Sequence, residues 1–151
     1  MSRAIARIFR LALGVGIAAA LMTPLTVLAD DSSIHIVSAK LVARGAEVDV
    51  TVSFTCPAGN VIGSAFGGGL FASIQQAVSK SQQAEGAGFA SQPSVCSGSA
   101  QTGVIQILAF YPGAPFRTGP AVIQAQLTEC TPDFVTCLFV NTGYTTVRIT
   151  K

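Results

Sequence analysis

The clearest pattern in the chain is the alternation of apolar and polar residues over residues 46–56. Because the side chains of a strand point alternately to opposite faces, a period of two predicts a half-buried β-strand. An apolar run over residues 34–42 precedes it and predicts a first strand. Arg44 and Gly45 lie between the two runs and favour a tight hairpin connection.

Later short runs, separated by Gly, Pro, Ser and Asn, predict further strands. They cover residues 102–110, 121–128, 138–140 and 146–150, and the last is expected to lie inside a sheet. Residues 70–78 fit both an apolar helical stripe and a strand. Propensity alone favours the helix, but every neighbouring element is β, so we expect a strand. The pattern therefore predicts an all-β domain.

The first 29 residues differ from the rest of the chain. Three arginines open this segment: Arg3, Arg7 and Arg10. An apolar run over residues 11–22 follows, and the small residues Val27 and Ala29 precede Asp30. A basic head, an apolar middle and a small-residue exit are typical of a secretory signal peptide. We therefore predict a cleaved leader over residues 1–29 and a single domain over residues 30–151.

The expected location is outside the cytoplasm: extracellular, or periplasmic if the source has an outer membrane. An uncleaved anchor is the alternative, but a spanning helix needs ~20 apolar residues and the run here is shorter. Pro24 and the acidic pair Asp30-Asp31 also argue against an anchor. No stable membrane insertion is expected after cleavage.

Charge excludes one class of partner. The chain has nine Lys and Arg residues and seven Asp and Glu residues, but three of the basic residues lie in the predicted leader. The remaining domain is therefore slightly acidic. Nucleic-acid binding needs clustered basic residues, whereas those that remain are scattered along the sequence: Lys40, Arg44, Lys80, Arg117, Arg148 and Lys151. We expect no nucleic-acid partner.

Four cysteines, Cys56, Cys96, Cys130 and Cys137, allow three disulfide connectivities. The six residues between Cys130 and Cys137 include Pro132-Asp133, which favours a turn, so these two cysteines are expected to face each other across a hairpin. That pairing leaves Cys56 with Cys96. A zinc site is the alternative, but the spacing lacks paired Cys-x-x-Cys motifs, and export favours oxidation.

Three segments resemble a known group of proteins. They are the strand sequence of residues 48–56, Cys96 followed by Ser97-Gly98, and residues 116–122 leading into a strand. Together they resemble small exported bacterial proteins, most of them uncharacterised, with an immunoglobulin-like β-sandwich. A more distant similarity is to the neocarzinostatin-type apoproteins. The resemblance implies an immunoglobulin-like antiparallel β-sandwich of about seven strands.

The same resemblance implies little about function. The chain has no Trp, whereas in immunoglobulin domains a Trp packs on the disulfide between the sheets. Antibody-like and receptor-like roles therefore do not carry over.

Residues able to support catalysis are few. His35 is the only histidine, and its place in the first strand favours an exposed structural role. Glu47 and Asp49 share one strand face, where acidic residues ordinarily serve solubility. The glycine-rich segment 63–69 lacks the Lys-Ser/Thr ending of a phosphate-binding loop. We therefore predict no catalytic residue, cofactor or metal ion.

Aromatic residues in the expected loops are the remaining binding candidates. Loops often carry binding residues, and aromatic side chains with an Arg are typical of interface hot spots. Alternatively, these rings fold back and cap the core. The candidates are Phe66, Phe89, Tyr111, Phe116, Arg117 and Phe134.

The sequence thus predicts an exported, non-catalytic binding or interaction module whose partner is an unknown protein or small molecule. Two alternatives stay open. A small extracellular hydrolase or enzyme inhibitor requires His35 or an acidic pair in a cleft. A carrier of an apolar small molecule requires an open cavity between the sheets.

The leader predicts a mature N-terminus at Asp30. Intact-mass measurement of the secreted protein should give the mass of residues 30–151, because the peptidase reads Val27 and Ala29. A full-length mass in the membrane fraction would contradict the predicted cleavage.

Overall fold

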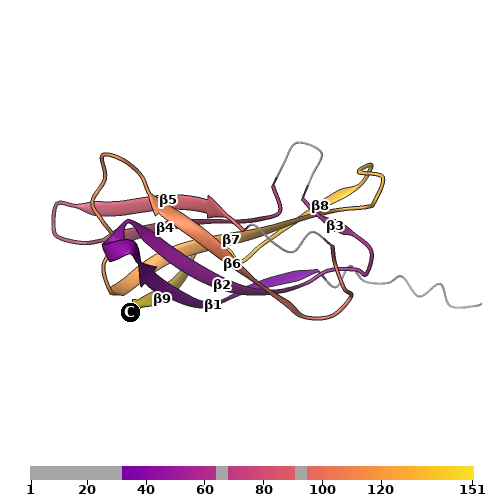
Figure 1. The fold of residues 1–151 in the computed structure, drawn as a ribbon, viewed down its shortest axis with the longest axis horizontal. Coiled ribbons are helices and arrows are strands. Elements are labelled where there is room, and N and C mark those ends of the chain that lie inside the picture. Colours follow the sequence, from indigo (N-terminus) through magenta and orange to yellow (C-terminus); the bar gives the residue numbers. More distant parts are fainter. Residues whose placement is uncertain (1–31, 64–67, 91–94) are drawn as a thin grey trace, which may run out of the picture.

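The computed structural model describes residues 32–63, 68–90 and 95–151. The predicted leader and Phe66 lie outside these residues. The described part forms nine strands and one short 3-10 turn (Figure 1). None of its helices is long and apolar enough to span a membrane. The elements are β1 (Ser33–Val42), η1 (Ala43–Gly45), β2 (Glu47–Thr55), β3 (Val61–Ile62), β4 (Leu70–Ala77), β5 (Gln83–Phe89), β6 (Gln101–Ala109), β7 (Gly119–Cys130), β8 (Cys137–Asn141) and β9 (Thr145–Thr150).

Seven of these strands close into a barrel. Their order is β7-β4-β5-β6-β2-β1-β9, and β9 pairs with β7 again. β9 runs parallel to β1 and antiparallel to β7, so it joins the two ends of the sheet. The short β3 and β8 attach to the far half of β7 (Figure 1). The all-β prediction is confirmed, but the predicted immunoglobulin-like sandwich is wrong.

The length of β7 explains the closure. This strand has twelve residues, longer than the run over 121–128 that the sequence pattern indicated. On one edge, residues 119–123 pair with β9 and residues 126–130 pair with β8. On the other edge β7 pairs with β4 and β3. A strand paired along both edges leaves no gap at which the sheet would divide into two layers.

The interior is built from the alternate positions that the sequence pattern marked. All four apolar members of β2 are fully buried: Val48, Val50, Val52 and Phe54. β7 contributes alternate residues from Ala121 to Leu127. Removing each large side chain of this kind from water stabilises the fold by about 1.5–3 kcal/mol. In β1 the register shifts between Ile36 and Ser38, which lets Ile34 and Ala39 both face inward.

Residues 70–78 were expected to form a strand, and β4 confirms this over Leu70–Ala77. The next strand, β5, was missed. Its sequence contains Gln, Glu and two glycines, residue types that strands disfavour. A Cβ atom on Gly88 would lie 1.8 Å from the carbonyl oxygen of Gln106. The glycines therefore permit β5 to approach β6 closely where the barrel turns.

Both predicted disulfides are present. Cys56 pairs with Cys96, and Cys130 pairs with Cys137 across the β7–β8 hairpin. The sequence separations are 40 and 7 residues. Chain-entropy arguments assign about 4 kcal/mol of stabilisation to the longer loop and about 2.5 kcal/mol to the shorter. Disulfides of this kind are typical of proteins that fold in an oxidising compartment.

Candidate functional site

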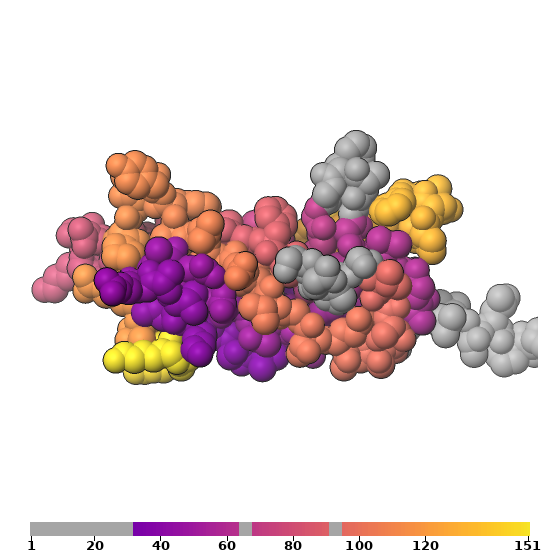
Figure 2. Space-filling view, in the orientation of Figure 1, coloured from indigo at the N-terminus to yellow at the C-terminus, as the bar shows by residue number. Residues whose placement is uncertain are grey.

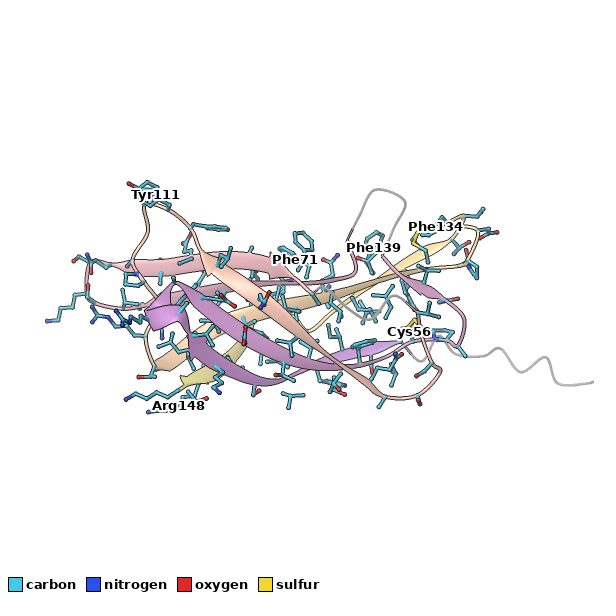
Figure 3. The ribbon with its side chains drawn as sticks, in the orientation of Figure 1. Cys56, Phe71, Tyr111, Phe134, Phe139 and Arg148 are labelled. Atoms are coloured by element: carbon cyan, nitrogen blue, oxygen red, sulfur yellow. A yellow bond between two sulfur atoms is a disulfide. The ribbon has the colours of Figure 1, made fainter. Side chains whose placement is uncertain are left out.

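Large apolar side chains cover part of the barrel's outside. They lie on the outer faces of β4, β5 and β6 and on the loop after β6. Phe89 and Leu108 are about 60 % exposed, and Tyr111 is 97 % exposed. Figure 3 shows Tyr111 standing away from the barrel at the loop tip. We call this surface the aromatic face, defined by Phe71, Phe89, Leu108, Phe110 and Tyr111.

Strand register makes the aromatic face continuous. Phe71 lies opposite Phe89, and their ring centroids are 5.0 Å apart at 49°. Ala87, two residues before Phe89, lies opposite Leu108. The backbone N–H of Phe110 donates to the carbonyl oxygen of Glu85 over 2.8 Å, so the pairing continues past the end of β6. Neighbouring strands therefore bring the four side chains from Phe71 to Phe110 onto one surface.

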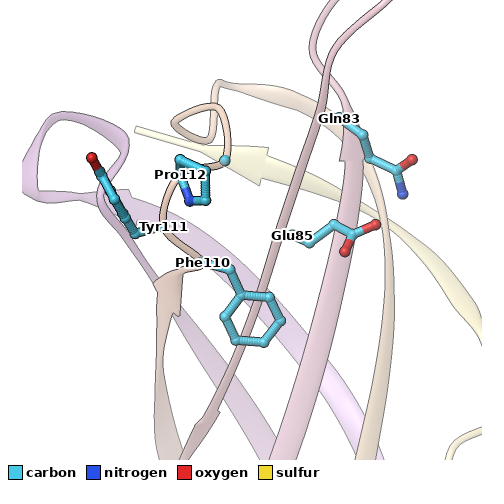
Figure 4. A pocket seen from close by; sticks show the side chains of 6 residues that line it. Gln83, Glu85, Phe110, Tyr111 and Pro112 are labelled. Atoms are coloured by element: carbon cyan, nitrogen blue, oxygen red, sulfur yellow. The ribbon is translucent and has the colours of Figure 1, made fainter.

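A pocket lies at the loop end of the aromatic face. Its volume is about 240 Å³, and it is lined by Gln83 and Glu85 from β5 and by residues 110–113 (Figure 4). The N–H of Gly113 donates to the carbonyl oxygen of Phe110 over 2.7 Å, which holds the loop in a tight turn. The loop projects from the body of the barrel (Figure 2). The pocket thus combines aromatic and proline walls with one carboxylate and one amide.

Two further carboxylates flank the aromatic face on β2. Glu47 lies opposite Leu108, and Asp49 lies opposite Gln106. Partial desolvation raises the pKa of Glu47, and the charge of Asp49 and a hydrogen bond with it raise that pKa further. Among the described residues, the buried Oδ1 atom of Asp49 has no hydrogen-bond partner. This oxygen atom of Asp49 is therefore a hydrogen-bond acceptor without a donor among the described residues.

The sequence candidates for catalysis are not brought together. His35 is exposed on β1 opposite Ser53 and does not line the pocket. Glu47 and Asp49 do interact, but on the outer surface of the barrel. The lining of the pocket includes neither of them.

The residues predicted as loop binding candidates differ in burial and in the element on which they lie. Phe116 is buried, and its N–H donates to the carbonyl oxygen of Gly45 over 2.8 Å, so this ring caps the core. Phe89 ends a strand, whereas Tyr111 lies in a loop as expected. Phe134 is 42 % exposed in the β7–β8 hairpin. Exposed Arg117 follows Phe116, and its backbone N–H donates to Oε1 of Gln76 over 2.8 Å.

Sequence reasoning missed the rest of the aromatic face. Phe71, Leu108 and Phe110 lie in predicted strands, and the sequence pattern did not single them out as binding residues. In β6 the alternation of buried and exposed residues places Ile105 and Ile107 inside and Leu108 outside. The strand pattern therefore held the signal, because both alternate positions of residues 104–108 include apolar side chains.

One buried cluster has the composition of a metal site. Sulfur atoms of Cys56 and Cys96 and a carboxylate oxygen of Glu129 lie within 4.8 Å of one another. The two sulfurs are bonded to each other, so neither is available as a thiolate ligand. The Glu129 carboxylate accepts hydrogen bonds from the Ser32 hydroxyl and the Asn60 side-chain amide. The cluster is a satisfied structural site beside the disulfide.

Comparison of the chain with protein-family models, with curated proteins and with solved structures finds no match.

The interaction between Glu47 and Asp49 predicts a pH effect. Replacing Asp49→Asn removes a neighbouring negative charge, so the pKa of Glu47 should fall. It should stay above its usual value, because desolvation still raises it. Because the pKa of Glu47 is higher in the folded state than in the unfolded state, Glu47 makes its full contribution to stability at pH values below the unfolded-state pKa. That contribution is lost as pH rises through the folded pKa.

An NMR titration of the Glu47 carboxyl carbon measures this shift. Asp133→Asn in the β7–β8 hairpin is the matched control and should leave the Glu47 pKa unchanged. An equal Glu47 pKa in Asp49→Asn and in the unmodified chain would show that the two carboxyls do not interact.

Proposed function

We propose that this protein is a secreted, non-catalytic binding module whose contact surface is the aromatic face. The observation that carries the proposal is the continuous row of exposed rings and Leu108 outside a barrel whose core is already filled. These side chains contribute nothing to the interior. Large exposed apolar patches on soluble proteins mark interaction sites.

The energetics of such a surface favour binding. Burying one large apolar side chain against a partner contributes about 1.5–3 kcal/mol before ordering costs are subtracted. Phe89, Leu108 and Phe110 are each more than half exposed, so each has most of this free energy still to gain. Phe71 and Phe89 already contact each other in a tilted arrangement, which lowers the entropy cost of ordering them.

Two independent features support a location outside the cytoplasm. The leader pattern over residues 1–29 predicts export, and two disulfides support folding in an oxidising compartment.

The placement of the titratable groups supports the proposal that the module is non-catalytic. A general base must lie within hydrogen-bond reach of the proton that it removes. His35 lies on β1, away from the pocket lining. Within the pocket, Glu85 is the one titratable carboxyl, so a paired-carboxylate mechanism has no second acid there.

A double variant tests the contact surface. In Phe89→Ser/Leu108→Ser, the free energy of unfolding should change by less than about 1 kcal/mol, because both side chains are mostly exposed. The unmodified secreted protein should carry a bound species, and the double variant should lose it. Native mass spectrometry of the protein recovered from the medium measures the bound species, and urea denaturation measures the stability.

The matched control is Phe139→Ser/Tyr144→Ser, which removes two exposed rings outside the aromatic face. It should retain the species bound by the unmodified chain. Equal retention by both double variants, or no bound species on the unmodified chain, would contradict the proposal.

A further inference from the structure

On the basis of the function proposed above, we propose that the partner is a basic polypeptide segment with apolar side chains. One of its Lys or Arg side chains enters the pocket between Glu85 and Phe110. Its apolar side chains cover Leu108 and Phe89. The chemistry of the aromatic face and its borders points to this occupant.

Carboxylates border the aromatic face on both sides. Glu85 lies beside Phe110 on the β5 side, and Glu47 lies opposite Leu108 on the β2 side. Asp49 follows on the same outer face as Glu47. Three of the five acidic residues in the described part of the chain thus lie around one apolar surface. A partner that carries positive charge beside apolar groups matches this arrangement.

The pocket fits a single cationic side chain. Its volume of about 240 Å³ lies below the ~300–1,000 Å³ that is usual for drug-sized ligands. The carboxylate of Glu85 offers a charge-assisted hydrogen bond, and an aromatic ring nearby attracts a cation through its π face. Figure 4 shows Glu85 and Phe110 on neighbouring segments, while the Tyr111 hydroxyl is turned away from them.

The β2 border adds two further carboxylates beside the aromatic face. Oδ1 of Asp49 is buried and has no hydrogen-bond partner among the described residues. Glu47 and Asp49 also repel each other, which raises the pKa of Glu47. A cation placed beside Glu47 would offset this repulsion.

Two basic groups also lie near the β2 border. Lys40 lies opposite Asp49 on β1, and Arg44 lies in η1 just before β2. Within the described residues, neither Lys40 nor Arg44 forms an ion pair with Glu47 or Asp49. A second copy is a poor occupant, because a two-fold interface through this face would place the same carboxylates against each other.

A labelled peptide of alternating Lys and Leu residues tests the proposal by fluorescence anisotropy with the full oxidised chain. The peptide should bind more tightly at low salt, because the partner charges are solvent-exposed. Glu85→Gln should weaken binding roughly tenfold, since it removes a charge-assisted hydrogen bond. Glu47→Gln/Asp49→Asn should weaken it and reduce its salt dependence. The matched control, Asp133→Asn, should leave binding unchanged.

Several outcomes would overturn the inference. One is that the Lys/Leu peptide does not bind at millimolar concentration, and another is that a Glu/Leu peptide binds equally well. A third is that hexylammonium alone binds with the same affinity, which would identify a free organic cation as the ligand. If peptide binding does not depend on charge but Leu108→Ser still weakens it, the inference of a basic partner fails, while the aromatic face stands as the contact surface. A dimer that Leu108→Ser dissociates would identify a second copy and overturn the inference.

Discussion

The pairing of β9 with both β1 and β7 is the constraint on which the rest of the structure depends. β9 supplies the seventh strand and joins the two ends of the sheet. Without it, β1 and the first half of β7 would each present an open edge. Such edges tend to pair with other chains. Closure covers part of these edges and fixes which side of every barrel strand faces the core.

Closure also determines the properties of the outer surface. Once the inward positions of β4, β5 and β6 pack the core, the alternate positions must face solvent. In β6 those outward positions include Val104 and Leu108, and in β5 they include Phe89. Gly86 and Gly88 bring β5 against β6 at this point, so Phe89 of β5 and Leu108 of β6 lie on one surface. The aromatic face is thus a consequence of the barrel combined with apolar residues that the core does not use.

The local pattern was sufficient for much of the fold. Strict alternation identified β2, and the alternation from Ala121 to Leu127 identified most of β7. The turn at Pro132-Asp133 was enough to pair the four cysteines correctly. These features depend on neighbours in sequence or on single side chains, which is the range over which propensity and periodicity act.

Features that depend on long-range packing were not accessible from the sequence. The choice between a sandwich and a barrel depends on whether β9 meets β7, and no local pattern records that contact. β5 forms through packing against β6 despite its glycines. Tyr111 precedes a proline and Phe116 follows one in the same loop. Phe116 nevertheless caps the core, whereas Tyr111 is almost fully exposed. Burial of a loop side chain is decided by the final position of the loop.

Native-state hydrogen exchange of the β9 amides tests the closed barrel most directly. A strand paired with β7 over five residues and with β1 over two should be protected to a level that approaches that of the central strand β2. Exchange of the β9 amides that is orders of magnitude faster than that of β2 would identify β9 as a fraying edge strand. That result would contradict the closed barrel and the outward assignment of the aromatic face.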